Sequence, residues 1–61
     1  MGTIYDNIAK LANEKGISIY KIEQEAGLGN GVIGRWRESS PNIDTLKKVA
    51  DVLEVPIEEL L

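Results

Sequence analysis

The stretch that decides the fold lies between residues 18 and 37 and has the sequence SIYKIEQEAGLGNGVIGRWR. Ser18 is a residue type that caps the start of a helix, and Ile22 belongs to the apolar face that follows. Gly27 favours the end of that helix, because glycine readily adopts the left-handed conformation that closes many helices. The pattern predicts a short helix and then, after only two connecting residues, a second helix over residues 30–37. Two helices joined this closely cross at a steep angle.

A further helix is predicted before this stretch. Thr3 stands at a capping position with the acidic Asp6 three residues on, and Gly16 has the residue type that ends a helix. The apolar residues between them follow the spacing of one helical face. These residues are Ile4, Ile8, Leu11 and Ala12.

Two more helices are predicted after it. Pro41 disfavours helix at the residue before it, and Asn42 has the side chain to cap a new helix. The apolar side of that helix consists of Leu46, Val49, Ala50 and Leu53. Pro56 is well placed as the first residue of a final short helix over residues 57–61. We therefore expect an all-α fold, a compact bundle of about five short helices, with residues 1–61 as a single domain.

Composition narrows the range of functions. The chain has no cysteine and no histidine, so it lacks disulfides, thiolate ligands and the commonest general base. The serines have no histidine to activate them, and the carboxylates fall mostly on exposed helical faces. We expect no enzymatic activity, no catalytic residue, no metal site and no cofactor. No apolar run approaches the roughly 20 residues of a membrane span, so we expect a cytoplasmic protein without a membrane partner.

The charge is distributed unevenly along the chain. The net charge is −3, which disfavours a nucleic-acid partner because contacts to phosphate need Lys and Arg. Basic and acidic residues balance up to Asn42, however, and the whole acidic excess follows that residue. This split is typical of a neutral-to-basic working face with an acidic back.

The predicted helix over residues 30–37 has two different faces. Its inner face consists of Val32, Ile33 and Trp36, and the spacing assigns Trp36 to the core rather than to base stacking. Its outer face consists of Asn30, Gly31, Gly34 and Arg35, with Arg37 at the border. Asn pairs with N6 and N7 of adenine, and Arg with O6 and N7 of guanine, in the major groove. The outer face is therefore a candidate base-reading surface.

The two glycines of this outer face need a physical reason. Each glycine inside a helix costs roughly 1 kcal/mol relative to alanine. One reason is close approach of the helix backbone to a partner surface. The other is relief of crowding against a neighbouring helix. We favour close approach, because Gly31 and Gly34 share their face with the two base-reading side chains.

A resemblance to a known family covers nearly the whole chain. It rests on apolar residues around the turn glycine Gly27, on the segment SPNIDTL at residues 40–46, on KVAD at residues 48–51, and on VPIEELL at residues 55–61. The apolar residues are Ile22, Ala26, Leu28, Ile33 and Trp36. Residues 19–38 resemble the helix-turn-helix of the lambda-repressor-like class, the Cro and phage-repressor type also called XRE. The resemblance implies a bundle of about five helices and binding to operator DNA, usually as dimers on paired half-sites.

The resemblance also implies roles for particular residues. The family's base-contacting places correspond to Asn30, Gly31 and Arg35, with Gly34 on the same face, and we add Arg37. Its phosphate-contacting places correspond to Ser18 and Tyr20 and to a loop with Ser39, Ser40 and Asn42; we add Lys21 and the backbone amide of Gly29. Tyr20 is equally compatible with a plain surface residue.

The chain departs from the family at Glu23, where the family usually has alanine, and we expect this carboxylate to point outward.

Two alternatives to a DNA-binding regulator stay open. The acidic end favours a protein-interaction module of the antitoxin or anti-repressor kind. The chain is also compatible with the DNA-binding part of a longer regulator. Leu60 and Leu61 would be partly exposed and available for a homodimer contact.

Overall fold

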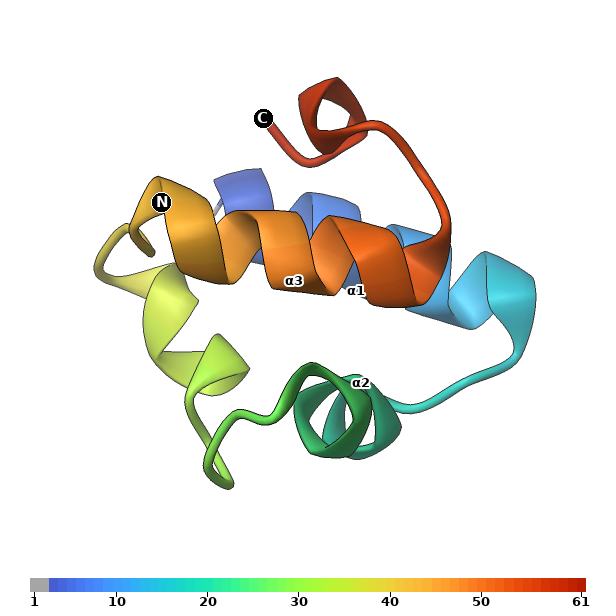
Figure 1. Cartoon of the computed structure of the whole chain (residues 1–61), viewed down its shortest axis with the longest axis horizontal. Helices are drawn as coiled ribbons and strands as arrows, with labels where there is room; N and C mark the ends of the chain where they lie inside the picture. Colours follow the sequence, from blue (N-terminus) through green and yellow to red (C-terminus); the bar gives the residue numbers. More distant parts are fainter. Residues whose placement is uncertain (1–2) are drawn as a thin grey trace.

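The computed structural model of the chain describes residues 3–61, and these residues fold into helices and connecting turns (Figure 1). Three segments are α-helices and two are 3-10 helices. In chain order they are α1 (Thr3–Lys15), α2 (Ile19–Ala26), η1 (Ile33–Arg37), α3 (Ile43–Leu53) and η2 (Ile57–Glu59). The expected all-α fold is confirmed, although two of the five helical elements are 3-10 rather than α.

The three α-helices end in the same way. The first residue after each helix is left-handed: Gly16 (φ 71°), Gly27 (φ 75°) and Glu54 (φ 59°). The amide of the following residue then donates to a carbonyl five residues back, as from Leu28 to Glu23 at 2.8 Å. This is the Schellman arrangement, which satisfies carbonyls that the helix leaves unpaired. The predicted ends at Gly16 and Gly27 are confirmed.

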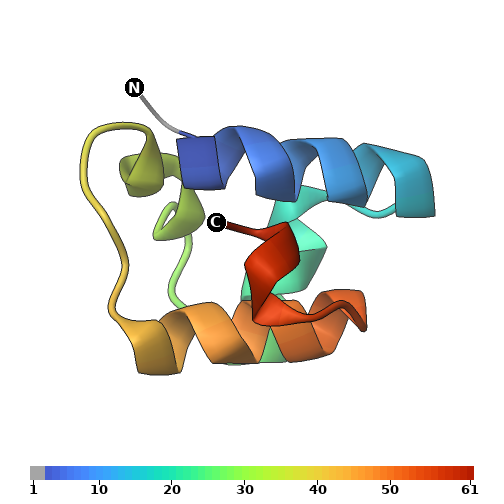
Figure 2. The same cartoon turned by 90° about the horizontal axis from the view of Figure 1, so that it is seen from above.

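The helices surround a single interior. Helices α1 and α3 run in roughly the same direction on two sides of it, and the C-terminal segment lies between them (Figure 2). Helix α2 is seen end-on beneath α3 in Figure 1 and contacts both α1 and α3. Element η1 packs against α1, and η2 packs against α3. The pair α2 and η1 therefore forms one side of the molecule, and η2 covers the opposite side.

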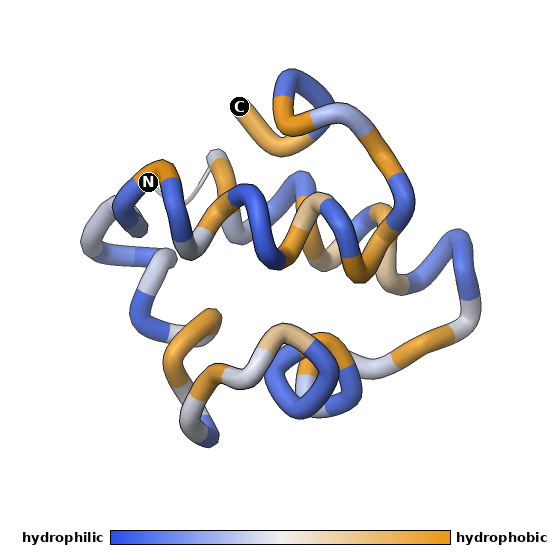
Figure 3. Tube along the Cα trace, in the orientation of Figure 1, coloured by the Kyte–Doolittle hydropathy of each residue, from blue (hydrophilic) through white to orange (hydrophobic). Residues whose placement is uncertain are grey.

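The apolar residues meet in this interior. In Figure 3 hydrophobic and polar positions alternate along the helices, and most of the hydrophobic positions are buried in the interior, with Ile43 at the start of α3 as an exposed exception. The buried side chains are Ile8, Ala12, Ile22, Ile33, Trp36, Leu46, Val49, Ala50, Leu53 and Leu60. Burying one aliphatic side chain of this size contributes about 1.5–3 kcal/mol. Each of the four longer helices predicted from the sequence thus contributes at least one of its predicted core residues to the observed core.

The C-terminal segment differs from the expectation. Element η2 ends at Glu59 rather than at residue 61, and Pro56 is extended (ψ 150°), so it precedes the helix instead of starting it. Leu60 is fully buried, whereas Leu61 is exposed. The side chain of Asn7 in α1 donates to the carbonyl oxygens of Leu60 at 3.1 Å and Leu61 at 3.2 Å. Leu60 is therefore a core residue and is not available for a dimer contact.

The start of α1 also differs slightly, because the helix already includes Thr3, and the position before it lies outside the described residues. None of the helices in residues 3–61 is long and apolar enough to cross a membrane.

Candidate functional site

Helix α2 begins and ends where the sequence predicts. The side-chain oxygen of Ser18 accepts a hydrogen bond from the amide of Lys21 at 3.0 Å, and Ser18 itself is extended. The cap satisfies one of the amides that every helix start leaves unpaired. Ile22 is fully buried below it. The first half of the helix-turn-helix unit is therefore confirmed.

The second half is not the helix expected over residues 30–37. Residues 30–32 form a turn, and a 3-10 helix follows from Ile33 to Arg37. The connection after α2 therefore runs from residue 27 to residue 32, not over two residues. Gly31 explains the difference, because its φ of 83° lies in the left-handed region that an α-helix excludes. Gly31 thus serves a turn rather than a helix interior.

The main correction concerns Glu23. The residue is 3% exposed, and its two carboxylate oxygens accept hydrogen bonds from the amides of Gly31 at 3.2 Å and Ile33 at 2.9 Å. The expectation that this carboxylate points outward is wrong. A buried charge requires hydrogen bonds to offset its lost hydration, and the two amides supply them. Glu23 therefore replaces the N-cap that η1 lacks, since Val32 makes no side-chain cap.

Two signals in the sequence pointed to this role. Glu23 lies four residues after Ile19 and one after Ile22, so it belongs to the inner stripe of α2. In addition, no Ser, Thr or Asp precedes the residue 30–37 stretch, whose first amides needed acceptors from elsewhere. The carboxylate of Glu23 on α2 supplies them.

The inner face of η1 is confirmed. Ile33 is 0% exposed and Trp36 is 6% exposed, and both belong to the core. Replacing a buried residue of this size by alanine typically costs about 2–5 kcal/mol. The two side chains hold η1 firmly against α1, so its outer residues are presented from a fixed backbone.

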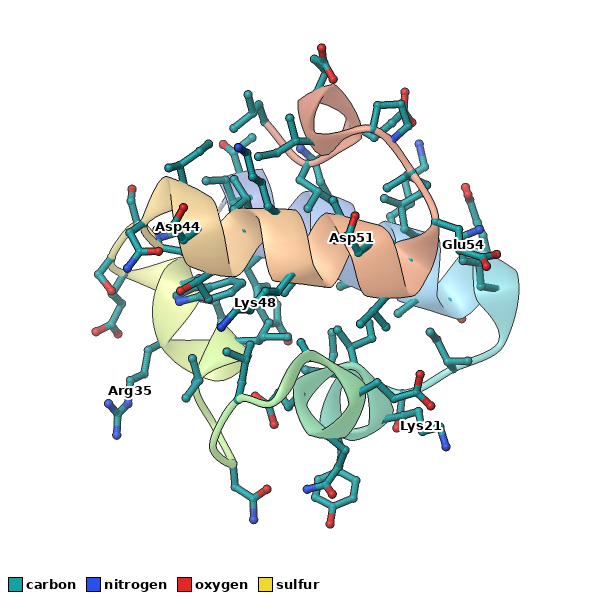
Figure 4. All side chains as sticks on the ribbon, in the orientation of Figure 1. Lys21, Arg35, Asp44, Lys48, Asp51 and Glu54 are labelled. Carbon is teal, nitrogen blue, oxygen red and sulfur yellow. The ribbon has the colours of Figure 1, made fainter. Side chains whose placement is uncertain are left out.

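Asn30 and Arg35 lie on the outside of this segment. Both are exposed, and within residues 3–61 neither side chain has a hydrogen bond or an ion pair. Figure 4 shows Arg35 extending from η1 away from the molecule, on the side that α2 also forms. One free amide and one free guanidinium are therefore available to a partner on this side.

Arg37 is held differently. Its Nε donates to the carbonyl oxygen of Gly34 at 3.2 Å, and its guanidinium carbon lies 5.1 Å from the centre of the Tyr5 ring. This is the geometry of a cation–π contact. The contact with Tyr5 of α1 holds the Arg37 side chain at the edge of the site, whereas the Arg35 side chain has no such contact.

The surface between these arginines is hollow. A depression of about 460 Å³ is lined by Gly31, Gly34, Arg35, Arg37 and Glu38. A Cβ atom added at Gly31 would meet nothing within 4 Å, and one added at Gly34 would meet only the end of the Arg37 side chain at 3.8 Å. Crowding against a neighbouring helix therefore does not explain either glycine.

The phosphate candidates are all exposed, but their side chains are not equally free. Lys21 pairs with Glu25 at 3.3 Å, and the Ser39 hydroxyl donates to the carbonyl of Arg35 at 3.3 Å. Asn42 caps α3 by accepting from the amide of Thr45 at 2.8 Å, as the sequence predicts, which leaves its amide protons free. The remaining candidates are Ser18, Tyr20, Gly29 and Ser40; Tyr20 is 57% exposed.

Among the described residues, no group of three or more acidic side chains could hold a metal ion.

The comparisons with known proteins identify the class of protein to which the chain belongs. A family model described as helix-turn-helix matches residues 8–60, which is most of the chain. The chain belongs to this family of DNA-binding domains, the XRE or lambda-repressor-like type, as its sequence resemblance indicated. Comparison with curated proteins and with solved structures gave no match.

Proposed function

We propose that this protein is a sequence-specific transcriptional regulator of the repressor type that reads operator DNA with residues 30–37. The observation that carries the proposal is the pair of free, exposed side chains, Asn30 and Arg35, on a backbone braced by the core. Asn and Arg are the side chains best suited to bidentate pairing with adenine and guanine in the major groove.

The hollow between Gly31 and Gly34 supports close approach to the DNA. A recognition surface without side chains at these positions lets the backbone lie near the base edges. Arg37, which Tyr5 and Gly34 hold at the rim, then fits a contact to the DNA backbone better than a contact to a base. Ser18, Tyr20 and Asn42 are exposed, and their side chains fit further phosphate contacts.

Selection from random oligonucleotides with the purified protein, at two salt concentrations, tests the proposal. We expect a defined sequence and binding that weakens as salt rises. Paired half-sites about one helical turn apart would support binding as a homodimer. Selection without any enriched sequence would contradict the proposal.

Arg35→Ala sharpens the test on a selected operator. Loss of a bidentate guanidinium should cost about 1–3 kcal/mol of binding and relax preference at one base pair. Lys10→Ala removes an equal charge from the exposed side of α1 and is the matched control. Equal effects of the two variants, with no change in sequence preference, would argue against base reading by Arg35.

A further inference from the structure

Glu23 is the one buried charged residue among residues 3–61. Its carboxylate has no cationic partner there, since the single ion pair of the described chain joins Lys21 and Glu25 on the exposed side of α2. A buried carboxylate balanced only by amides is expensive compared with an apolar residue of similar size. Alanine at this position would avoid that cost, so the carboxylate needs a reason beyond filling space.

The two hydrogen bonds of Glu23 fix the backbone at the start of the exposed segment. One holds Gly31 in its left-handed turn, and the other holds Ile33 where η1 enters the core. Asn30 directly precedes this clamped stretch and has no side-chain hydrogen bond of its own within the described residues. The backbone direction at Asn30 is therefore fixed from the interior of the protein. The side chain that fixes it, Glu23, is buried and cannot contact a partner on the outer surface.

The same bonds change what the segment offers to DNA. Free amides at the start of a helix commonly bind phosphate. Here the amides of Gly31 and Ile33 are already engaged, and the group that engages them is negatively charged. The start of the segment is thus unsuited to binding a phosphate. Its contribution to DNA binding therefore depends on side chains that are held in a defined direction.

We propose that Glu23 is a positioning residue for base recognition, which acts by fixing the turn that carries Asn30. The inference rests on the proposed function. It predicts that loss of Glu23 lowers the preference for operator over unrelated DNA, because a loosened turn must be ordered again on binding and only base contacts need that order. Loss of the negative charge of Glu23 should strengthen binding to selected and unrelated DNA alike, so the ratio between the two reports the loss of order.

Two substitutions grade the effect. Glu23→Ala removes both acceptors, and Glu23→Gln keeps one oxygen while its amide group cannot accept from the second N–H. Val49→Ala, which shortens a fully buried side chain of α3 outside the site, is the control for lost stability. All proteins are compared below their unfolding temperatures, at equal folded fractions.

The readout is the ratio of dissociation constants for unrelated and selected DNA. We expect Glu23→Ala to lower this ratio roughly tenfold, which is within the discrimination between bases that one bidentate side chain gives. The ratio for Glu23→Gln should lie between those of Glu23→Ala and the parent protein. Val49→Ala should leave the ratio unchanged. An unchanged ratio in folded Glu23→Ala, or an equal fall in Val49→Ala, would overturn the inference.

Amide hydrogen exchange separates this inference from the proposed function. In Glu23→Ala the amides of Gly31 and Ile33 should exchange faster while those of the α3 core keep their protection. If the parent protein selects no DNA sequence, the proposed function fails and the base-positioning role fails with it. Faster exchange would then leave the clamp itself established as a structural element.

Discussion

The guanidinium of Arg37 lies against the ring of Tyr5, 5.1 Å from its centre, and so connects the last residue of η1 to α1. A cation–π contact at an exposed site contributes about 0.5–1 kcal/mol. It also restricts the rotamers of a long side chain before any partner arrives. Arg37 is therefore the only arginine of the described site with a fixed direction, whereas Arg35 is free.

Tyr5→Leu should release Arg37. We expect a loss of about 0.5–1 kcal/mol in unfolding free energy and weaker binding to selected and unrelated DNA alike, because we propose a contact of Arg37 to the DNA backbone. Tyr5→Phe keeps the ring and serves as the control. Urea unfolding and salt-dependent binding measure the two effects. A change in sequence preference would contradict a backbone role for Arg37.

Gly34→Ala separates folding from close approach. The added methyl group would meet only the end of the Arg37 side chain, and the backbone at Gly34 is not left-handed. Alanine also suits helical backbone better by up to about 1 kcal/mol. Unfolding free energy should stay equal or rise, while operator affinity falls because the methyl group holds the backbone away from the bases. Undiminished affinity would show that no partner surface reaches Gly34.

Glu54→Gly should stabilise the protein. Glu54 closes α3 with a φ of 59°, a conformation that costs an L-residue roughly 1–2 kcal/mol. Glycine removes that cost but gives the unfolded chain more freedom, so we expect a net gain of about 0.5–1 kcal/mol in thermal or urea unfolding. Gly27→Ala makes the reverse change at the end of α2, where a Cβ meets nothing within 4 Å, and should destabilise by a similar amount. A loss of stability in Glu54→Gly would mean that its side chain contributes more than its backbone strain costs.

Asn7→Ala should loosen the C-terminal segment. Its two hydrogen bonds to the carbonyls of Leu60 and Leu61 each contribute about 1 kcal/mol, so we expect a loss of about 1–2 kcal/mol. Asn13→Ala changes an exposed asparagine of the same helix and should cost little. Similar urea midpoints for the two variants would show that the hydrogen bonds of Asn7 are not needed.

Local chemistry explains which parts of the structure were predictable. Ser18, Gly27 and Asn42 act through their own backbone surroundings, so residue type and spacing sufficed to find them. The spacing of Ile33 and Trp36 correctly places both in the core, but an interval of three residues is common to α and 3-10 helices. It therefore left the kind of helix undetermined.

The errors arose where distant residues decide the outcome. The turn at Gly31 depends on the carboxylate of Glu23, eight residues earlier, and charge alone suggested that this carboxylate would face solvent. Leu60 is buried because α1 and α3 leave space for it, which no pattern near the C-terminus reveals. The exposed positions of Asn30 and Arg35 were predicted, whereas the clamp behind them was not.

The contact between Asn7 and Leu60 joins residues 53 positions apart. During synthesis the core is therefore complete only once Leu60, one of its fully buried members, has left the ribosome. A nascent chain of this protein presents its helices before it can close them around a common interior. Any activity that depends on the η1 segment should accordingly be reduced in a chain that lacks Leu60.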